Sequence, residues 1–154
     1  MPTPPPPRTA AERKEHVLRL LDTEPDAWVA TADDGVPTLI PLSFAWTGTA
    51  LVLSTPAGSP TGRNLAASGM VRIALGGTRD VVLIRGNVHT YSSVDVPDEL
   101  ADLFAAKHAW DPCKDTSSSG AYAFFDVTPV RIQAWREENE LKGRTLMRDG
   151  AWLV

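Results

Sequence analysis

The chain has 154 residues, 43% hydrophobic and 22% charged, which suits a single soluble globular domain large enough to bury a core. Its formal net charge of −4 argues against nucleic acid as a partner, because there is no excess of basic residues to neutralise phosphates. No apolar run approaches the roughly 20 residues that cross a bilayer, so we expect no membrane partner.

The first eight residues, MPTPPPPR, are dominated by proline. They have no apolar segment of the secretory type, so we expect residues 1–8 to be a disordered arm before a single domain over residues 9–154. Cys113 is the only cysteine, which excludes an internal disulfide and a cysteine-cluster metal site. The lone cysteine and the lack of a secretory segment predict a cytoplasmic location. The histidines are scattered without metal-ligand spacing, so we predict no metal.

Hydrophobic periodicity predicts many strands and few, short helices. A capping box from Thr9 to Glu12 begins a helix over residues 10–21, and Asp33-Asp34-Gly35 predicts a tight hairpin turn. The expected strands cover residues 27–32, 36–46, 49–55, 70–75, 81–91, 121–127 and 130–136, with further helices over 60–68 and about 96–109, a flexible polar loop over 111–120 and a small hairpin within 144–154. Strands in hairpin order without strand–helix alternation predict a mainly β fold, an antiparallel β-barrel with flanking helices.

Residues 51–65, LVLSTPAGSPTGRNL, read as a strand, a turn of small residues and the start of a helix. Ser59 is the candidate N-cap of that helix, and Pro60 occupies the position that proline favours. The N–H groups of a helix start can hold an anion, and Thr61 and Arg63 add a hydroxyl and a cation. The stretch is therefore either a phosphate cradle for a cofactor or only a well-capped helix.

The order of features from residue 27 to residue 91 resembles the pyridoxamine 5'-phosphate oxidase-like family of split-barrel flavoproteins. The matching segments are Val29-Ala30-Thr31, Asp34 to Pro37, Pro41 to Phe44, Leu53 to Thr55, Ser59 to Leu65, Val81 to Gly86 and, near the end, Val130 to Trp135. The resemblance implies an antiparallel split β-barrel that forms a homodimer. Two FMN or deazaflavin sites would lie in grooves between the subunits.

The resemblance also implies which residues bind the cofactor. The isoalloxazine ring would lie along residues 41–44 and 53–55, the phosphate would lie at residues 59–63, and Trp135 would come from the second subunit. The implied cofactor-binding residues are Pro41, Leu42, Ser43, Phe44, Ser54, Thr55, Ser59, Thr61, Arg63, Asn64, Arg79 and Trp135. Pro60-Thr61 replaces the basic pair that usually follows the family's serine, which removes two charge-assisted phosphate contacts.

Three functions follow from these observations. The first is an FMN-dependent oxidoreductase acting on a small molecule, in which the cofactor carries the redox chemistry. The second is a deazaflavin-dependent reductase whose cofactor has an acidic tail, for which Arg63, Arg79, Arg131 and Arg136 are candidate contacts. The third is a cofactor-free ligand-binding protein on the same barrel. No catalytic side chain is predicted, and His89 is expected to be a structural or surface histidine because no carboxylate partner is fixed by the sequence.

Overall fold

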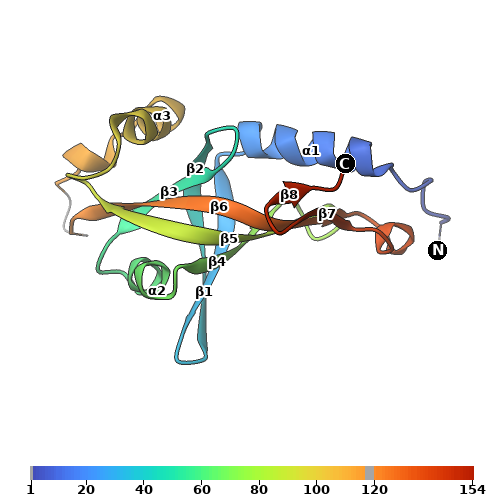
Figure 1. The fold of residues 1–154 in the computed structure, drawn as a ribbon, viewed down its shortest axis with the longest axis horizontal. Helices are drawn as coiled ribbons and strands as arrows, with labels where there is room; N and C mark the ends of the chain where they lie inside the picture. Colours follow the sequence, from blue (N-terminus) through green and yellow to red (C-terminus); the bar gives the residue numbers. More distant parts are fainter. Residues whose placement is uncertain (1, 117–119) are drawn as a thin grey trace.

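The computed structural model describes residues 2–116 and 120–154, and within them eight strands form one antiparallel sheet (Figure 1). The strands are β1 (Asp26–Asp33), β2 (Val36–Trp46), β3 (Leu51–Pro56), β4 (Met70–Leu75), β5 (Val81–Ser92), β6 (Tyr122–Trp135), β7 (Thr145–Arg148) and β8 (Ala151–Trp152). Their order is β3-β2-β1-β4-β5-β6-β7-β8, and an additional pairing of β3 with β6 closes β1 to β6 into a barrel. The predicted antiparallel split β-barrel is confirmed.

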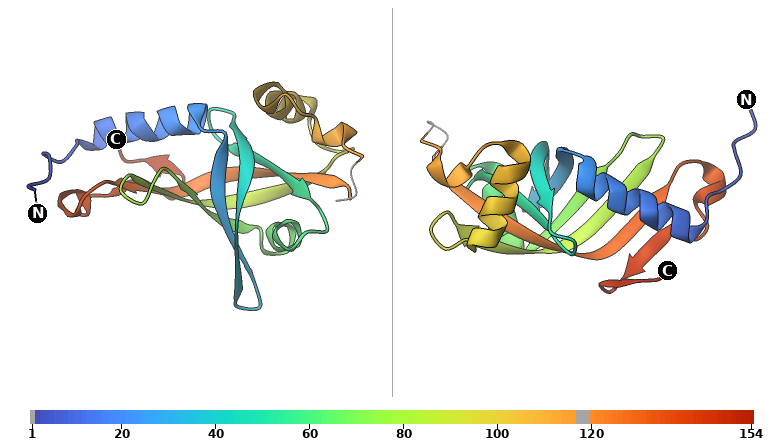
Figure 2. Two further views of the ribbon diagram at one scale, coloured as in Figure 1. Left: turned by 180° about the vertical axis from the view of Figure 1, so that it is seen from behind. Right: turned by 90° about the horizontal axis from the view of Figure 1, so that it is seen from above.

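Three α-helices flank this barrel: α1 (Ala10–Thr23), α2 (Pro60–Ser68) and α3 (Asp98–His108). Helices α1 and α3 lie on one side of the barrel, whereas α2 lies on the other, beside the β1–β2 hairpin that extends beyond the barrel (Figures 1 and 2). Asp34 and Gly35 both have positive φ at the tip of that hairpin, as its turn sequence predicts.

Several predicted bounds match the structure, but the end of the sheet differs from the prediction. Strands 121–127 and 130–136 were expected to be separate, and this is wrong: both belong to β6. Pro129 pairs with Gly86 next to a bulge in β6, where Val130 is the extra residue between the Arg85–Arg131 and Gly86–Pro129 pairs. A Cβ at Gly86 would collide with the Val127 side chain, so glycine permits the close approach of the two strands. The expected flexible loop 111–120 begins with the 3₁₀ helix Pro112–Lys114, and residues 117–119 of it lie outside the described residues.

The barrel interior is filled by large apolar side chains, including those of Phe44, Leu53, Ile73, Ile84 and Phe125, none more than 1% exposed. A second cluster lies under α3, where buried Phe104 packs edge-on against Phe124. Together the two clusters fix β2, β3 and β6, the strands that carry the candidate site. No helix in the described residues is long and apolar enough to cross a bilayer.

A charge network joins the N-terminal arm to the end of the barrel where β6 ends. Arg8 donates hydrogen bonds to Glu140 from its backbone N–H and from its guanidinium, at 2.8–3.0 Å, and the N–H of Arg136 donates to the same carboxylate. These hydrogen bonds lower the pKa of Glu140 to about 2. Arg136 and His16 both contact Asp80, at 3.3 and 2.9 Å. The disorder expected for residues 1–8 stays a prediction.

Candidate cofactor site

The barrel opens where β2 and β3 separate. The two strands pair only from Phe44–Leu53 to Trp46–Leu51, although β2 begins at Val36 and β3 continues to Pro56. Beyond that point β2 pairs on its other edge with β1, and β3 pairs on its other edge with β6. We call the facing edges of residues 41–43 and 54–56 the open edge. The main-chain groups of residues 41–43, 54 and 55 that point to it have no strand partner in the described part of the chain, so they are available to a ligand, whereas the Pro56 carbonyl accepts from Ser59.

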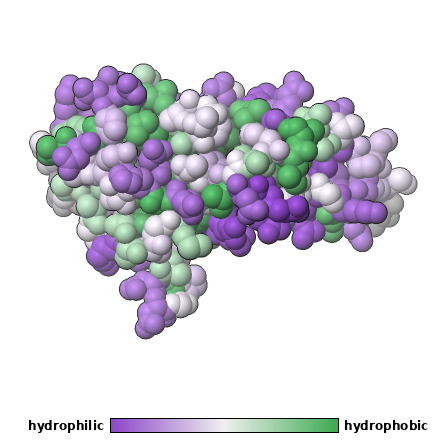
Figure 3. Space-filling model, viewed as in Figure 1, coloured by the Kyte–Doolittle hydropathy of each residue, from purple (hydrophilic) through white to green (hydrophobic). Residues whose placement is uncertain are grey.

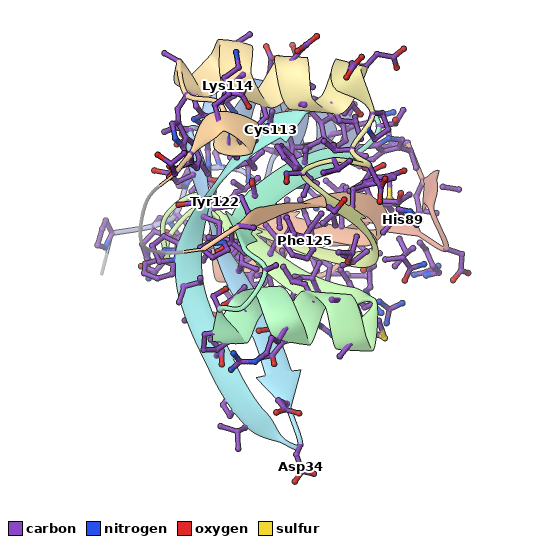
Figure 4. The ribbon with its side chains drawn as sticks, turned by 90° about the vertical axis from the view of Figure 1, so that its left-hand side faces the viewer. Asp34, His89, Cys113, Lys114, Tyr122 and Phe125 are labelled. Atoms are coloured by element: carbon purple, nitrogen blue, oxygen red, sulfur yellow. The ribbon has the colours of Figure 1, made fainter. Side chains whose placement is uncertain are left out.

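A cavity of about 300 Å³ lies along the open edge. It is lined by Asp26, Pro41, Leu42, Ser43, Ser54, Thr55, Pro56, Trp110 and Tyr122. The rings of Trp110 and Tyr122 meet edge-on at 5.0 Å and form an aromatic wall. Tyr122 lies at the start of β6, between α3 and α2 (Figure 4). The cavity combines flat apolar walls with unpaired main-chain groups, which suits a planar heterocycle.

Five of the residues predicted to bind the isoalloxazine ring line this cavity: Pro41, Leu42, Ser43, Ser54 and Thr55. Two of their hydroxyls already have partners, because Ser43 Oγ donates to Asp26 at 2.8 Å and Ser54 Oγ donates to the Ala123 carbonyl at 2.9 Å. What these positions offer a ligand is therefore chiefly their backbone.

Phe44, also predicted to bind the ring, turns its side chain into the barrel core and is fully buried. Its carbonyl lies 2.8 Å from His108 Nε2, and the ammonium of Lys107 lies 4.0 Å from its ring centroid. Burial lowers the pKa of Lys107. Phe44 therefore belongs to the support of the site rather than to the surface of the cavity.

The Ser59 hydroxyl and two N–H groups of the helix start are engaged in the helix's own contacts. Ser59 Oγ accepts from the N–H of Gly62 at 3.0 Å and donates to the carbonyl of Pro56 at 2.8 Å, and the N–H of Arg63 bonds to the Ser59 carbonyl. Thr61 is 1% exposed. The capped helix is therefore present, and the phosphate cradle stays a prediction. Arg63 is the exposed cation of this first turn, and its guanidinium donates to the carbonyl of Gly58.

Asn64 is also turned away from the cavity. Its side chain is 7% exposed and donates to Thr31 Oγ1 at 3.1 Å, so it fixes α2 against β1. At the candidate phosphate corner, Arg63 is therefore the one exposed cation among the predicted phosphate-binding residues. Thr61 and Asn64 are buried and hold the helix in place.

Arg79 and Trp135 lie at the opposite end of the barrel from the cavity. Trp135 pairs with Val81, whereas the cavity end of the same ladder is the Ser92–Ala123 pair, eleven residues along β5. At roughly 3.3 Å per residue the two ends are about 36 Å apart. Arg79 forms an ion pair with Glu137 at 2.8 Å. A single chain therefore does not bring these two residues to the cavity.

Sequence reasoning missed Trp110, Tyr122, Asp26 and Pro56 as cavity residues. The available signal was that Trp110 and Tyr122 stand on either side of the polar loop 111–120, so closing that loop brings them together. No group of three or more His, Cys, Asp or Glu side chains within residues 2–116 and 120–154 is placed to hold a metal ion.

A closed antiparallel barrel with one open edge defines the class of this protein as a split β-barrel. A model of the family described as pyridoxamine 5'-phosphate oxidase matches residues 14–136, most of the chain. The chain therefore belongs to the pyridoxamine 5'-phosphate oxidase-like family. No curated protein matches the sequence.

Solved structures with the same fold have little sequence in common with the chain. General stress protein 26 from Bacillus anthracis strain Sterne superimposes with a TM-score of 0.62 at 17% identity, covering 81% of this chain and 95% of that one. An F420 reductase gives 0.57 at 20% identity, covering 74% and 93%. An FAD-binding protein from Mesorhizobium loti gives 0.57 at 17% identity, covering 84% and 95%. At these identities the likeness shows the fold.

Proposed function

We propose that the protein is a flavin-dependent oxidoreductase that binds FMN at the open edge and acts on a small molecule. The observation that carries this proposal is the cavity of about 300 Å³ between two strand edges with unpaired main-chain groups. Membership of the pyridoxamine 5'-phosphate oxidase-like family supports it. When bound, the flavin would supply the electron-transfer chemistry.

The chain's own residues would bind and shield that cofactor. Main-chain groups of residues 41–43 and 54–55 that point to the open edge would hydrogen-bond the polar rim of the ring. Trp110 and Tyr122 would exclude water from its face. Arg63 would attract the phosphate. With Ser59 engaged in capping, we expect phosphate binding to contribute less than in a site with a basic pair.

We also propose a homodimer, because part of the outer barrel face is apolar and uncovered. Trp28 is 50% and Leu39 is 62% exposed, and Trp28 lies beside Ala74, which is followed on the next strand by Leu83. Burying such a face between two subunits is favourable. A dimer would also let Trp135 and Arg79 of one subunit approach the cavity of the other.

A deazaflavin is the second candidate cofactor. The engagement of the Ser59 hydroxyl in capping favours a cofactor that depends less on phosphate binding at this corner. The structural likeness to an F420 reductase supports the same candidate. A cofactor-free ligand-binding protein is the third candidate.

The experiment is to purify the protein without added cofactor, record its visible spectrum, and titrate FMN and the 8-hydroxy-5-deazaflavin coenzyme separately at micromolar protein. FMN binding with the higher affinity is the expected result. Tighter binding of the deazaflavin would favour the second candidate. Binding of neither would overturn both oxidoreductase proposals and leave the cofactor-free protein.

The phosphate contact has its own test. We expect Arg63→Ala to weaken FMN binding about fivefold, the equivalent of about 1 kcal/mol for a charge-assisted contact. Arg148→Ala is the matched control, since Arg148 is an exposed arginine on β7. Equal affinities for both variants would remove Arg63 from the site.

A further inference from the structure

Three arginines form a row across the outer face of the barrel. Arg72 on β4 is the register partner of Arg85 on β5, which is the partner of Arg131 on β6. We call these three residues the arginine row. Their chain neighbours Val71, Ile73, Ile84 and Ile132 are buried in the barrel core, so the arginines point outward. Figure 3 shows a strongly hydrophilic patch over this part of the sheet.

In the described part of the chain, no carboxylate forms an ion pair with the arginine row. Within residues 2–116 and 120–154, the ion pairs use Arg8, Arg79 and Arg136 among the arginines, and none of them involves the row. The neighbouring outward positions on the three strands are neutral: Met70, Ala74, Leu83, Asn87 and Gln133. Like charges directly opposite each other destabilise a sheet. A bound anion would relieve this repulsion.

A second cavity, of about 420 Å³, adjoins the row. Arg72 and Arg85 form its charged side, and Ala30, Ala32 and Met70 contribute to an apolar side. None of its lining residues belongs to the cavity at the open edge. Its volume is in the range of small-molecule sites.

We propose that the arginine row and this cavity bind a small phosphorylated molecule. Guanidinium groups present planar pairs of donors that match phosphate oxygens, and two or three of them can share one dianion. The phosphate would lie between Arg72 and Arg85 with Arg131 beside them, and the uncharged part of the ligand would lie over Ala30, Ala32 and Met70. This site does not depend on the cofactor proposed for the open edge. Ala74 and Leu83, next to the row, also belong to the face proposed for the homodimer, so the ligand would bind at the border of that interface.

The test is calorimetric titration of the full chain with two probes, phenyl phosphate and inorganic phosphate. We expect saturable binding of both, tighter for phenyl phosphate because its ring reaches the apolar side. Arg72→Gln/Arg85→Gln should lose at least about tenfold in affinity, since charge-assisted hydrogen bonds are among the strong ones. Binding of inorganic phosphate as tight as that of phenyl phosphate would overturn the assignment of the cavity to an organic ligand.

The matched control is Lys114→Gln/Lys142→Gln, which removes the same charge from two exposed positions elsewhere. It should bind both probes like the wild type, and an equal loss in the control would overturn the proposal as a general charge effect. Because the arginines repel one another, the double arginine variant should melt no lower than the wild type, which separates loss of binding from loss of folding.

Two further measurements distinguish this ligand site from a part of the cofactor site and from a contact between copies of the chain. FMN titration of Arg72→Gln/Arg85→Gln should match the wild type, and loss of FMN binding would reassign the row to the cofactor site. Light scattering should give the same oligomeric state for both proteins. A variant that dissociates, with a wild type that binds neither phosphate probe, would assign the row to a contact between copies of the chain and overturn the proposal.

Discussion

The two ends of the β5–β6 ladder use their polar groups in opposite ways. At the end near Trp135, which we call the closed end, Arg8 forms ion pairs with Glu140 at 2.8 Å and with Asp80 at 4.0 Å. At the end near Tyr122, the open end, β2 leaves β3 and main-chain groups face a cavity. The difference teaches that stability and ligand binding are located in different parts of one barrel. Substitutions at each end should therefore separate the two properties.

The largest effect is expected at the closed end, from Glu140→Gln. Glu140 is 4% exposed, and its hydrogen bonds with Arg8 lower its pKa from 4.5 to about 2. At about 1.4 kcal/mol per pKa unit, losing the charge should cost up to about 3.5 kcal/mol of unfolding free energy at pH 7. Urea denaturation measures this, while FMN affinity should not change. An unchanged midpoint would show that the network contributes nothing to stability.

The lowered pKa of Glu140 also predicts that the unfolding free energy depends on pH in the acid range. A folded-state pKa below the unfolded value means that the stabilisation is complete above about pH 4.5 and is lost as the pH falls toward about 2. The wild type should therefore lose more unfolding free energy between pH 7 and pH 3 than Glu140→Gln does. Parallel pH profiles of the two proteins would contradict the assignment of this pKa.

At the open end, Gly62→Ala should have the next largest effect. A Cβ at Gly62 would collide with the carbonyl oxygen of Pro56, a residue that lines the cavity. We expect a loss of about 1–2 kcal/mol in thermal or urea unfolding, even though alanine favours helix over glycine. Gly58→Ala is the control, because its added methyl group meets open space and should change stability by less than about 0.5 kcal/mol. Equal stabilities of the two variants would show that α2 can shift freely.

The sequence predicted most of the fold because turn residues mark its elements. Strand 36–46 and helix 60–68 have their predicted bounds, since Gly35, Ser59, Pro60 and Gly69 delimit them locally. Two strands were predicted where β6 is continuous, because Pro129 normally interrupts a strand. Only the pairing with Gly86 shows that this proline is tolerated.

The candidate site was less predictable, because it depends on which contacts are already made. The stretch around Ser59 contains the residue types of a phosphate cradle, yet its hydroxyl is occupied by Gly62 and Pro56. Likewise, Trp110 lines the cavity because of how the chain runs between α3 and β6, and no local sequence pattern specifies that course. The arginine row could not be seen without the strand register.

Trp110 and Trp152 offer a spectroscopic comparison of the two ends. Trp110 lines the cavity, whereas Trp152 lies on β8 near the closed end, where Lys14 lies over its ring. If FMN binds at the open edge, it should quench tryptophan fluorescence, and Trp110→Phe should reduce this quenching while Trp152→Phe should not. Because phenylalanine retains most of the aromatic packing, FMN affinity should change by less than about 1 kcal/mol. Quenching that depends on Trp152 instead would place the flavin elsewhere.

The smallest effect on stability is expected from Arg79→Gln. Arg79 contacts Glu137 at 2.8 Å, but its side chain is 76% exposed, so water screens the pair and its loss should cost less than about 0.5 kcal/mol. A loss above about 1 kcal/mol would show that the closed end depends on this exposed pair as well.

FMN binding gives a second readout for Arg79, because in the proposed dimer Arg79 lies at the partner's cavity. Arg79→Gln should therefore weaken FMN binding, whereas Glu137→Gln, which frees the arginine, should not. If neither substitution changes FMN affinity, the closed end contributes stability alone and Arg79 has no part in the cofactor site.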